Sequence, residues 1–223
     1  EQLQRKKPVI ACSSITTHLH MPKDQRFGQA SILTPEQLQD LCNSFPVGQH
    51  KYISLVLAFS GARVSEVLAL QWRDIKDDYI LFKSINTKTK KSREVVLHPK
   101  LKQHLKDWKE KYWYQFPLLN KTKNNLERRA PTPDCFLFKG RNRNTHLTRQ
   151  AFDKQLRAQL DYLLIEGATT HSYRRSNLTA AKDAGMALSD IMQISGHTSL
   201  DALNKYLAPN QKEMKKVVGA FGF

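Results

Sequence analysis

The chain has 223 residues, of which 40% are hydrophobic, enough for one large domain with a buried core. Its 36 Lys and Arg against 20 Asp and Glu give a formal net charge of +16, which favours a polyanionic partner over an acidic or neutral one. No apolar run is long enough to span a membrane, and the three scattered cysteines form neither a Cys-x-x-Cys metal motif nor a disulfide framework, so we expect a cytoplasmic, nucleoid-associated protein without a metal site.

Residues 1–30 are polar, basic and without a sustained hydrophobic period, so we predict a linker or N-terminal arm. The first residue is Glu1 rather than Met, which favours a fragment or a processed chain, and the sequence leaves open whether an N-terminal domain is missing. Residues 31–223 are predicted to form one domain.

The first regular elements of this domain are predicted helices. Thr34 is a candidate helix cap, followed by Pro35 and Glu36, which both suit the first turn of a helix. Residues 52–59 are apolar enough for a buried helix that ends at a glycine, and a second short helix is predicted over residues 64–70.

A basic hairpin is predicted next. Strand-like runs at 79–82 and 94–97 flank the segment 85–93, which is rich in Lys and Thr. An amphipathic helix over 99–116 and an exposed loop over 117–134 follow.

The last third of the chain is predicted to be helical. Helices are expected near 148–165, 171–184, 188–195 and 199–207, and a short C-terminal tail helix near 210–218. Together these elements predict an α+β fold, mainly α-helical with a small antiparallel β-sheet.

Four short stretches contain residues suited to phosphate chemistry. In the first, Arg63 follows a glycine turn between two apolar helices, and Glu66 lies one helical turn on, where it can hold the guanidinium. An arginine at a helix start is more often a solvated surface residue. The second stretch is the hairpin with Lys88, which alone would be one solvated lysine among several; Lys90 and Lys91 lie so close that the hairpin register leaves the choice among them open.

The third and fourth stretches lie in the predicted C-terminal helices. His171 and Arg174 are three residues apart, so they share a helix face and can point at one target. Gly196 permits a tight break between helices just before His197, and Tyr206 lies in the last helix before the tail. A tyrosine in such a helix is usually a core residue.

Each stretch is a weak signal, but their order resembles the tyrosine recombinase family, which includes the phage integrases and the recombinases that resolve chromosome dimers. The similarity covers roughly residues 34–210. It rests on the strings GARVSEVLAL at 61–70, TKTKKSREVVL at 87–97, HSYR at 171–174, SGHTS at 195–199 and NKY at 204–206. Two positions depart from the usual pattern: Ser195 stands where the family often has Leu, and Arg175 where it often has His.

The resemblance implies an enzyme that cuts and rejoins DNA through a 3′-phosphotyrosine, without metal, cofactor or ATP. It places the catalytic roles at Arg63, Lys88, His171, Arg174, His197 and Tyr206. Tyr206 is then the nucleophile, His171 a plausible base and Lys88 the general acid. Glu66 and Gly196 are supporting residues. Contacts to DNA phosphates are expected from Lys90, Lys91, Arg93 and Arg175.

The implied partners are double-stranded DNA and further copies of the chain, in a homotetramer on paired sites, with accessory DNA-bending proteins as a further possibility. The outcome would be integration, excision or resolution of a mobile element. The tail has apolar positions that suit docking onto a neighbouring subunit and packing on their own domain equally well: Met214, Val217, Val218, Ala220 and Phe221.

Three other interpretations remain open from the sequence. A type IB topoisomerase-like enzyme shares the chemistry but relaxes DNA as a monomer. A catalytically inactive relative would bind DNA only, although all the active-site positions are filled. A basic structural or RNA-binding protein is the third, although no stacking motif of the common RNA-binding modules is visible.

Overall fold

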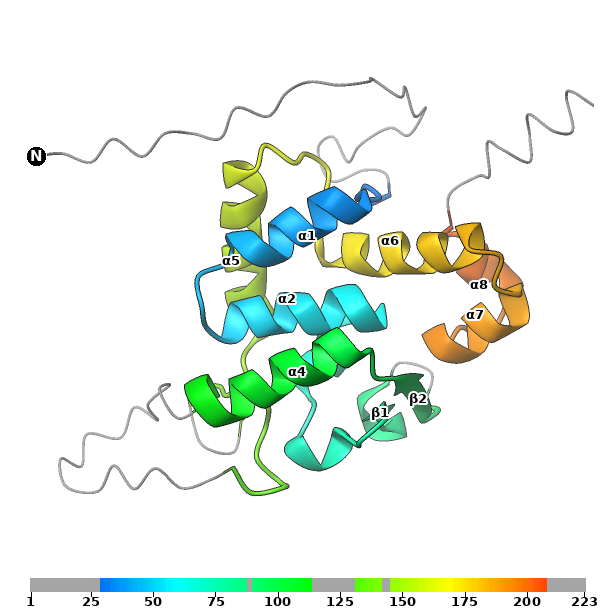
Figure 1. Ribbon diagram of the computed structural model, residues 1–223. Coiled ribbons are helices and arrows are strands. Elements are labelled where there is room, and N and C mark those ends of the chain that lie inside the picture. The colour runs from blue at the N-terminus through cyan, green and yellow to red at the C-terminus, as the bar shows by residue number, and fades with distance from the viewer. Residues whose placement is uncertain (1–28, 88–89, 114–130, 142–144, 208–223) are drawn as a thin grey trace, which may run out of the picture.

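The computed structural model describes residues 29–87, 90–113, 131–141 and 145–207. Most of the predicted arm at 1–30, the tail helix near 210–218 and Lys88 lie outside these residues. Within them the fold is mostly helical with one small antiparallel sheet, as the sequence predicts (Figure 1). No described helix has the length and apolar character needed to cross a membrane.

Three helices begin the described chain. Helix α1 (Pro35–Ser44) is capped by Thr34, whose hydroxyl accepts from the Gln37 amide while the Gln37 side chain accepts from the Thr34 amide. Helix α2 (Gln49–Ser60) ends at Gly61, which has a left-handed φ of 59°. A Cβ at Gly61 would lie 2.6 Å from Oδ1 of Asn177, so close packing also favours glycine here. Helix α3 (Val64–Leu68) follows at once.

The predicted hairpin is present as two antiparallel strands. Strand β1 (Tyr79–Phe82) pairs with β2 (Arg93–Val96), with Phe82 opposite Arg93 and Tyr79 opposite Val96. The short 3₁₀ turns η1 (Trp72–Asp74) and η2 (Ser84–Asn86) precede and follow β1. The second strand therefore begins at Arg93, one residue before the predicted start.

Helix α4 (Pro99–Asp107) passes into a π-helical turn, η3 (Trp108–Tyr112), where the sequence predicted one continuous helix. Trp108 is fully buried at that change, and its indole N–H donates to the Leu137 carbonyl oxygen over 3.0 Å. The remaining helices are α5 (Arg149–Tyr162), α6 (Thr170–Asp183), α7 (Leu188–Ser195) and α8 (Leu200–Asn204).

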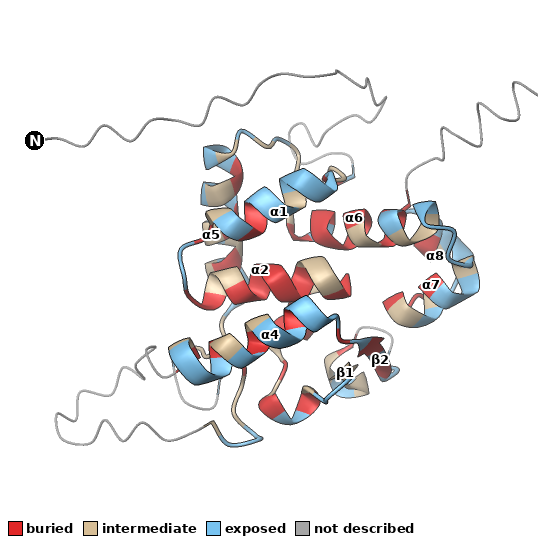
Figure 2. Cartoon of the chain, in the orientation of Figure 1, coloured by how far each residue is buried: buried red, intermediate tan, exposed pale blue. Residues whose placement is uncertain are grey.

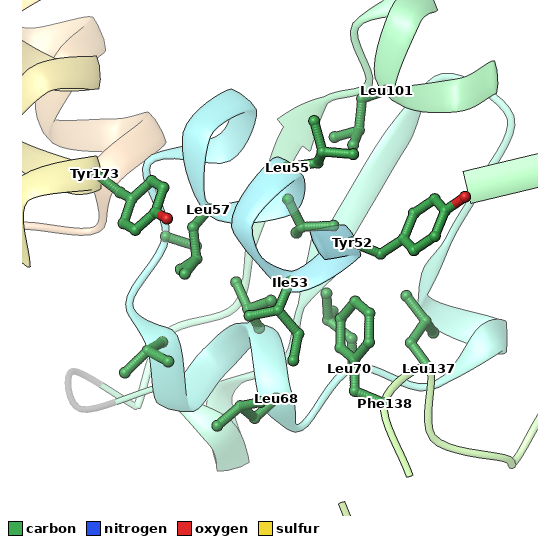
Figure 3. Close-up of a cluster of buried hydrophobic side chains, with 14 of the residues drawn as sticks. Tyr52, Ile53, Leu55, Leu57, Leu68, Leu70, Leu101, Leu137, Phe138 and Tyr173 are labelled. Carbon is green, nitrogen blue, oxygen red and sulfur yellow. The ribbon is translucent and has the colours of Figure 1, made fainter. Parts of the chain in front are cut away.

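Helix α2 is the centre of the main core (Figure 2). It lies between α1, α4 and α6, and most of its residues are buried, which explains why its sequence is apolar on every side. Figure 3 shows its side chains packed with residues from other elements. These include Leu68, Leu70, Leu101, Leu137, Phe138 and Tyr173.

A second, smaller core holds the C-terminal helices in place. Leu178 of α6, Ile191 of α7 and Leu203 of α8 form it together with Leu207. Helix α7 also packs against β2, so the hairpin, α6 and the α7–α8 turn meet in one region (Figure 1). This meeting point brings together residues that are about 100 positions apart in the chain, such as Arg93 and Ile194.

Candidate active site

A buried carboxylate, Glu66, organises one side of the site. Its Oε1 lies 3.1 Å from Nη1 of Arg63, and its Oε2 lies 2.5 Å from Nη2 of Arg93. The Arg63 amide also donates to Oε2 over 2.9 Å. Burial opposes ionisation of Glu66, but the hydrogen bond and charge of Arg93, with those of Arg63, outweigh it and lower the pKa of the carboxyl. Glu66 is thus a charged clamp that fixes Arg63, whose side chain remains 17% exposed.

Arg93 lies inside the protein, although the sequence suggested a DNA contact. Its Nε donates to the Ile194 carbonyl oxygen over 2.9 Å, and its guanidinium lies 4.6 Å from the centre of the Phe82 ring. The backbone of Gly196, which has a φ of 69°, lies close to the Arg93 side chain. A Cβ at this position would be 3.3 Å from Cδ of Arg93. The Arg93 guanidinium is therefore hydrogen-bonded to residues of α3 and α7. We assign it a positioning role in place of the expected phosphate contact.

Replacement of Glu66 by glutamine removes the carboxylate charge and tests directly how much its ion pairs stabilise the protein. In Glu66→Gln two arginines lose their counter-charge in a buried setting, so we expect the free energy of unfolding at neutral pH to fall by about 3 kcal/mol. Because the folded-state pKa of Glu66 is lowered, its contribution is present above the ordinary glutamate pKa and is lost as the pH falls through the folded value. The difference between the two proteins should therefore shrink below about pH 4.

Urea unfolding over a range of pH measures this difference. Glu94→Gln, at an exposed position of β2, is the matched control and should change little. A loss in Glu66→Gln no larger than in the control would show that the clamp contributes nothing, and a larger loss that is independent of pH would show that the charge of Glu66 is not its source.

Arg174 occupies the middle of the site and is only 1% exposed. Its Nη1 donates to the Gly61 carbonyl oxygen over 2.9 Å, and its Nη2 donates to the Ser195 carbonyl oxygen over 2.6 Å. Among the described residues its Nε has no hydrogen-bond partner. Burial, and then the charge of Arg63, lowers the pKa of Arg174 to about 9, which still leaves the guanidinium charged at neutral pH.

The phenol of Tyr206 lies against this cationic centre. Its ring centre is 5.4 Å from Cζ of Arg174, 5.0 Å from the His197 ring centre and 6.1 Å from that of His171. Tyr206 follows α8 and is half-buried. His171 and Arg174, one turn apart on α6, thus both approach the same tyrosine ring, which is the convergence expected from their spacing.

Arg175 holds the backbone of Tyr206 and does not extend into solvent. It is buried, its Nε donates to the Tyr206 carbonyl oxygen over 3.2 Å, and its Nη1 donates to the carbonyl oxygen of Ala30. The expected phosphate contact from Arg175 is therefore replaced by a role in placing Tyr206. Ala30 comes from the start of the described chain, a connection that no local sequence pattern indicates.

His197, which directly follows Gly196, is buried. Burial, followed by the charges of Arg174, Arg63 and Arg93, lowers its pKa to about 4, so the ring is neutral at neutral pH. Its ring nitrogens lie 3.3 Å from Nη2 of Arg174 and 2.7 Å from Oγ of Ser195. The sequence did not single out Ser195 as a site residue; the only signal was its departure from the usual leucine.

The hairpin borders an open hollow beside these residues. The hollow has a volume of about 500 Å³ and is lined by Lys91, Met192 and His197, among others. Lys90 and Lys91 are both exposed, and the Lys91 carbonyl oxygen accepts from the Thr87 hydroxyl over 3.0 Å. Both lysines are thus available to a ligand outside the protein.

The described part of the site is suited to an anion that reacts with a phenol. The positive charge of the site exceeds the single negative charge of Glu66, because three arginines lie there: Arg63, Arg93 and Arg174. Guanidinium groups held in fixed positions can stabilise the negative charge that develops on phosphate oxygens during phosphoryl transfer. Among the residues that the structure describes, no three or more His, Cys, Asp or Glu side chains form a potential metal-ion site.

Comparison with known proteins agrees with this arrangement. A family model described as "Phage integrase family" matches residues 32–213. The putative integrase/recombinase y4eF of Sinorhizobium fredii is 27% identical over 177 residues, which make up 79% of this chain and 63% of that protein. The tyrosine recombinase XerC of Herpetosiphon aurantiacus is 27% identical over 199 residues, 86% of this chain and 60% of that protein. The chain therefore spans less than two thirds of the length of either relative.

Solved structures share the fold. The XerA recombinase superposes with a TM-score of 0.65 at 20% identity, over 85% of this chain and 64% of that one. XerH bound to its difH substrate gives a TM-score of 0.61 at 19% identity, over 90% and 57% of the two chains. A lambda integrase tetramer bound to a Holliday junction gives 0.58 at 16% identity, over 80% and 48%. These likenesses confirm the predicted α+β fold.

Proposed function

The chain belongs to the phage integrase family, and we propose that it is a site-specific DNA recombinase whose Tyr206 cleaves and rejoins DNA strands. One observation supports this more than any other: the Tyr206 ring lies 5.4 Å from the buried Arg174 guanidinium and 5.0 Å from the His197 ring. A tyrosine that served only to fill the core would not need two such polar neighbours. In this proposal residues 31–223 form the catalytic domain, and residues 1–30 form a linker or arm.

The proposed reaction is a transesterification at a DNA phosphodiester. The Tyr206 oxygen attacks the phosphorus, a bond to the phosphate forms, and the bond to the 5′ oxygen breaks. His171 accepts the phenolic proton, and Lys88 gives a proton to the leaving oxygen. The 3′-phosphotyrosine keeps the energy of the phosphodiester, so attack by a 5′-hydroxyl rejoins the strand without ATP.

Stabilisation of the transition state is assigned to two arginines of the site. Arg63 and Arg174 bind the non-bridging oxygens, where charge develops, and supply the positive charge that a metal ion supplies in many phosphoryl-transfer enzymes. His197 lies with Nε2 3.3 Å from Nη2 of Arg174 and helps to hold that guanidinium in place. Glu66 and Arg93 keep Arg63 in place, and Arg175 keeps the Tyr206 backbone in place.

The proposed partner is double-stranded DNA, with phosphates bound by exposed cations such as Lys90 and Lys91. A homotetramer on two paired sites is part of the proposal. It is suggested by the lambda integrase structure, which is described as a tetramer bound to a Holliday junction. Integration, excision or resolution of a mobile element, a nucleoid location and the help of DNA-bending proteins complete the proposal.

Strand exchange between two duplexes tests the proposed function. Duplexes that bind the full-length protein are first enriched from a random-sequence library, and two labelled copies of different length are then incubated with the protein without ATP and with a chelator. Recombinant lengths are expected. Relaxation of supercoiled plasmid without exchange would indicate a topoisomerase, and binding without either reaction would indicate an inactive relative.

A further inference from the structure

A buried series of polar contacts passes through the His197 ring. On one side, the Ser195 hydroxyl lies 2.7 Å from His197 Nδ1 and 3.3 Å from the Met192 carbonyl oxygen. On the other side, Nη2 of Arg174 lies 3.3 Å from His197 Nε2. Ser195 is 2% exposed and Arg174 is 1% exposed, so both contacts are shielded from water.

The chemistry of these partners determines where the imidazole proton lies. A guanidinium has donors only, so the nitrogen facing Arg174 has to be an acceptor without hydrogen. The one hydrogen of the neutral ring is then on Nδ1 and is donated to the Ser195 oxygen. The Ser195 hydrogen is left to point at the Met192 carbonyl oxygen, which also accepts from the Gly196 and His197 amides at the end of α7.

The opposite arrangement fails on the same contacts. If the Ser195 hydroxyl donated to Nδ1, the ring hydrogen would sit on Nε2 and face the N–H donors of Arg174 at 3.3 Å. Two donors would then meet in a buried place with no acceptor between them, which is unfavourable. The neutral state of the ring at neutral pH agrees with this choice, since burial and then Arg174 lower the pKa of His197 to about 4.

We propose that Ser195 is a positioning residue that holds His197 in the tautomer with hydrogen on Nδ1, so that Nε2 is the atom presented to the centre of the site. This inference rests on the proposed function for its effect on the reaction. A serine oxygen accepts from Nδ1–H in the neutral ring and in the imidazolium alike, so the contact keeps the ring orientation in either proton state. The leucine common in the family at this position offers no such acceptor.

Nuclear magnetic resonance of the free protein tests the tautomer without any DNA. The protein is labelled with ring-¹⁵N histidine, and the His197 signals are identified by their loss in His197→Gln. Ser195→Thr and Ser195→Val differ by a hydroxyl at nearly constant shape. We expect a protected Nδ1 hydrogen in wild type and Ser195→Thr and its rapid exchange in Ser195→Val. A hydrogen on Nε2 in wild type, or equal spectra for the two variants, would overturn the proposal.

The rate of covalent complex formation at saturating DNA tests the consequence. Ser195→Val should react about tenfold more slowly than Ser195→Thr, because a buried donor loses its acceptor, with DNA affinity the same in both. Ser189→Ala, an exposed serine on the same helix, should match wild type. Equal rates for the Thr and Val variants would overturn the effect on the reaction. A wild type that forms no covalent complex would count against the proposed function, and the spectra would still decide the Ser195 contact.

Discussion

Replacement of Arg174 by alanine is expected to slow formation of the covalent protein–DNA complex by about a thousandfold, the cost of removing a main electrostatic contact to a developing oxyanion. The guanidinium is placed by the Gly61 and Ser195 carbonyl oxygens, and its Nε is unused among the described contacts. It is therefore a pre-oriented donor beside Tyr206. Single-turnover kinetics on a nicked duplex measure the rate.

Two controls separate chemistry from folding in this experiment. Arg149→Ala removes an exposed arginine whose ion pair with Asp153 lies on α5, and should leave the rate near that of wild type. Melting temperatures of both variants show whether the buried change unfolds the protein at the assay temperature. Arg174→Lys keeps the charge but loses the planar fork, so it should recover only part of the rate. A folded Arg174→Ala that cleaves nearly normally would refute the assignment.

Tyr206→Phe is expected to abolish covalent complex formation while DNA affinity stays within about twofold, because only the hydroxyl is removed and the ring can still pack near His197. Gel shifts measure the affinity, and denaturing gels measure the complex. Tyr162→Phe, at an exposed tyrosine on α5, is the control and should retain full activity. Loss of DNA binding in Tyr206→Phe would indicate a structural tyrosine, and retained cleavage would indicate another nucleophile.

The sequence predicted most elements because their local patterns are strong. The Thr34 cap, the apolar α2 and the hairpin strands are each specified within a few neighbouring residues. The continuous helix predicted over 99–116 was wrong at Trp108, where the chain forms a π-helical turn around a fully buried indole. Tertiary packing of that large side chain overrides the local helical period.

Most members of the candidate site were predictable from the sequence, but Ser195 and several of the contacts were not. Local strings identified Arg63, Arg174 and Tyr206. Arg93 and Arg175 each stand beside other polar or basic residues, a context typical of a solvated surface, so the sequence suggested DNA contacts for both. Their partners, Glu66 for Arg93 and the Tyr206 backbone for Arg175, lie 27 and 31 residues away and are reached only in the folded chain.

The central claim is that Tyr206 becomes covalently joined to DNA, and mapping of the adduct tests it most directly. The protein is incubated with a nicked duplex enriched for binding, the complex is digested with protease and nuclease, and the modified peptide is identified by mass spectrometry. The account predicts a nucleotide attached through its 3′ phosphate to Tyr206, with a free 5′-hydroxyl on the released strand. An adduct on any other residue, or cleavage of bound DNA without an adduct, would contradict it.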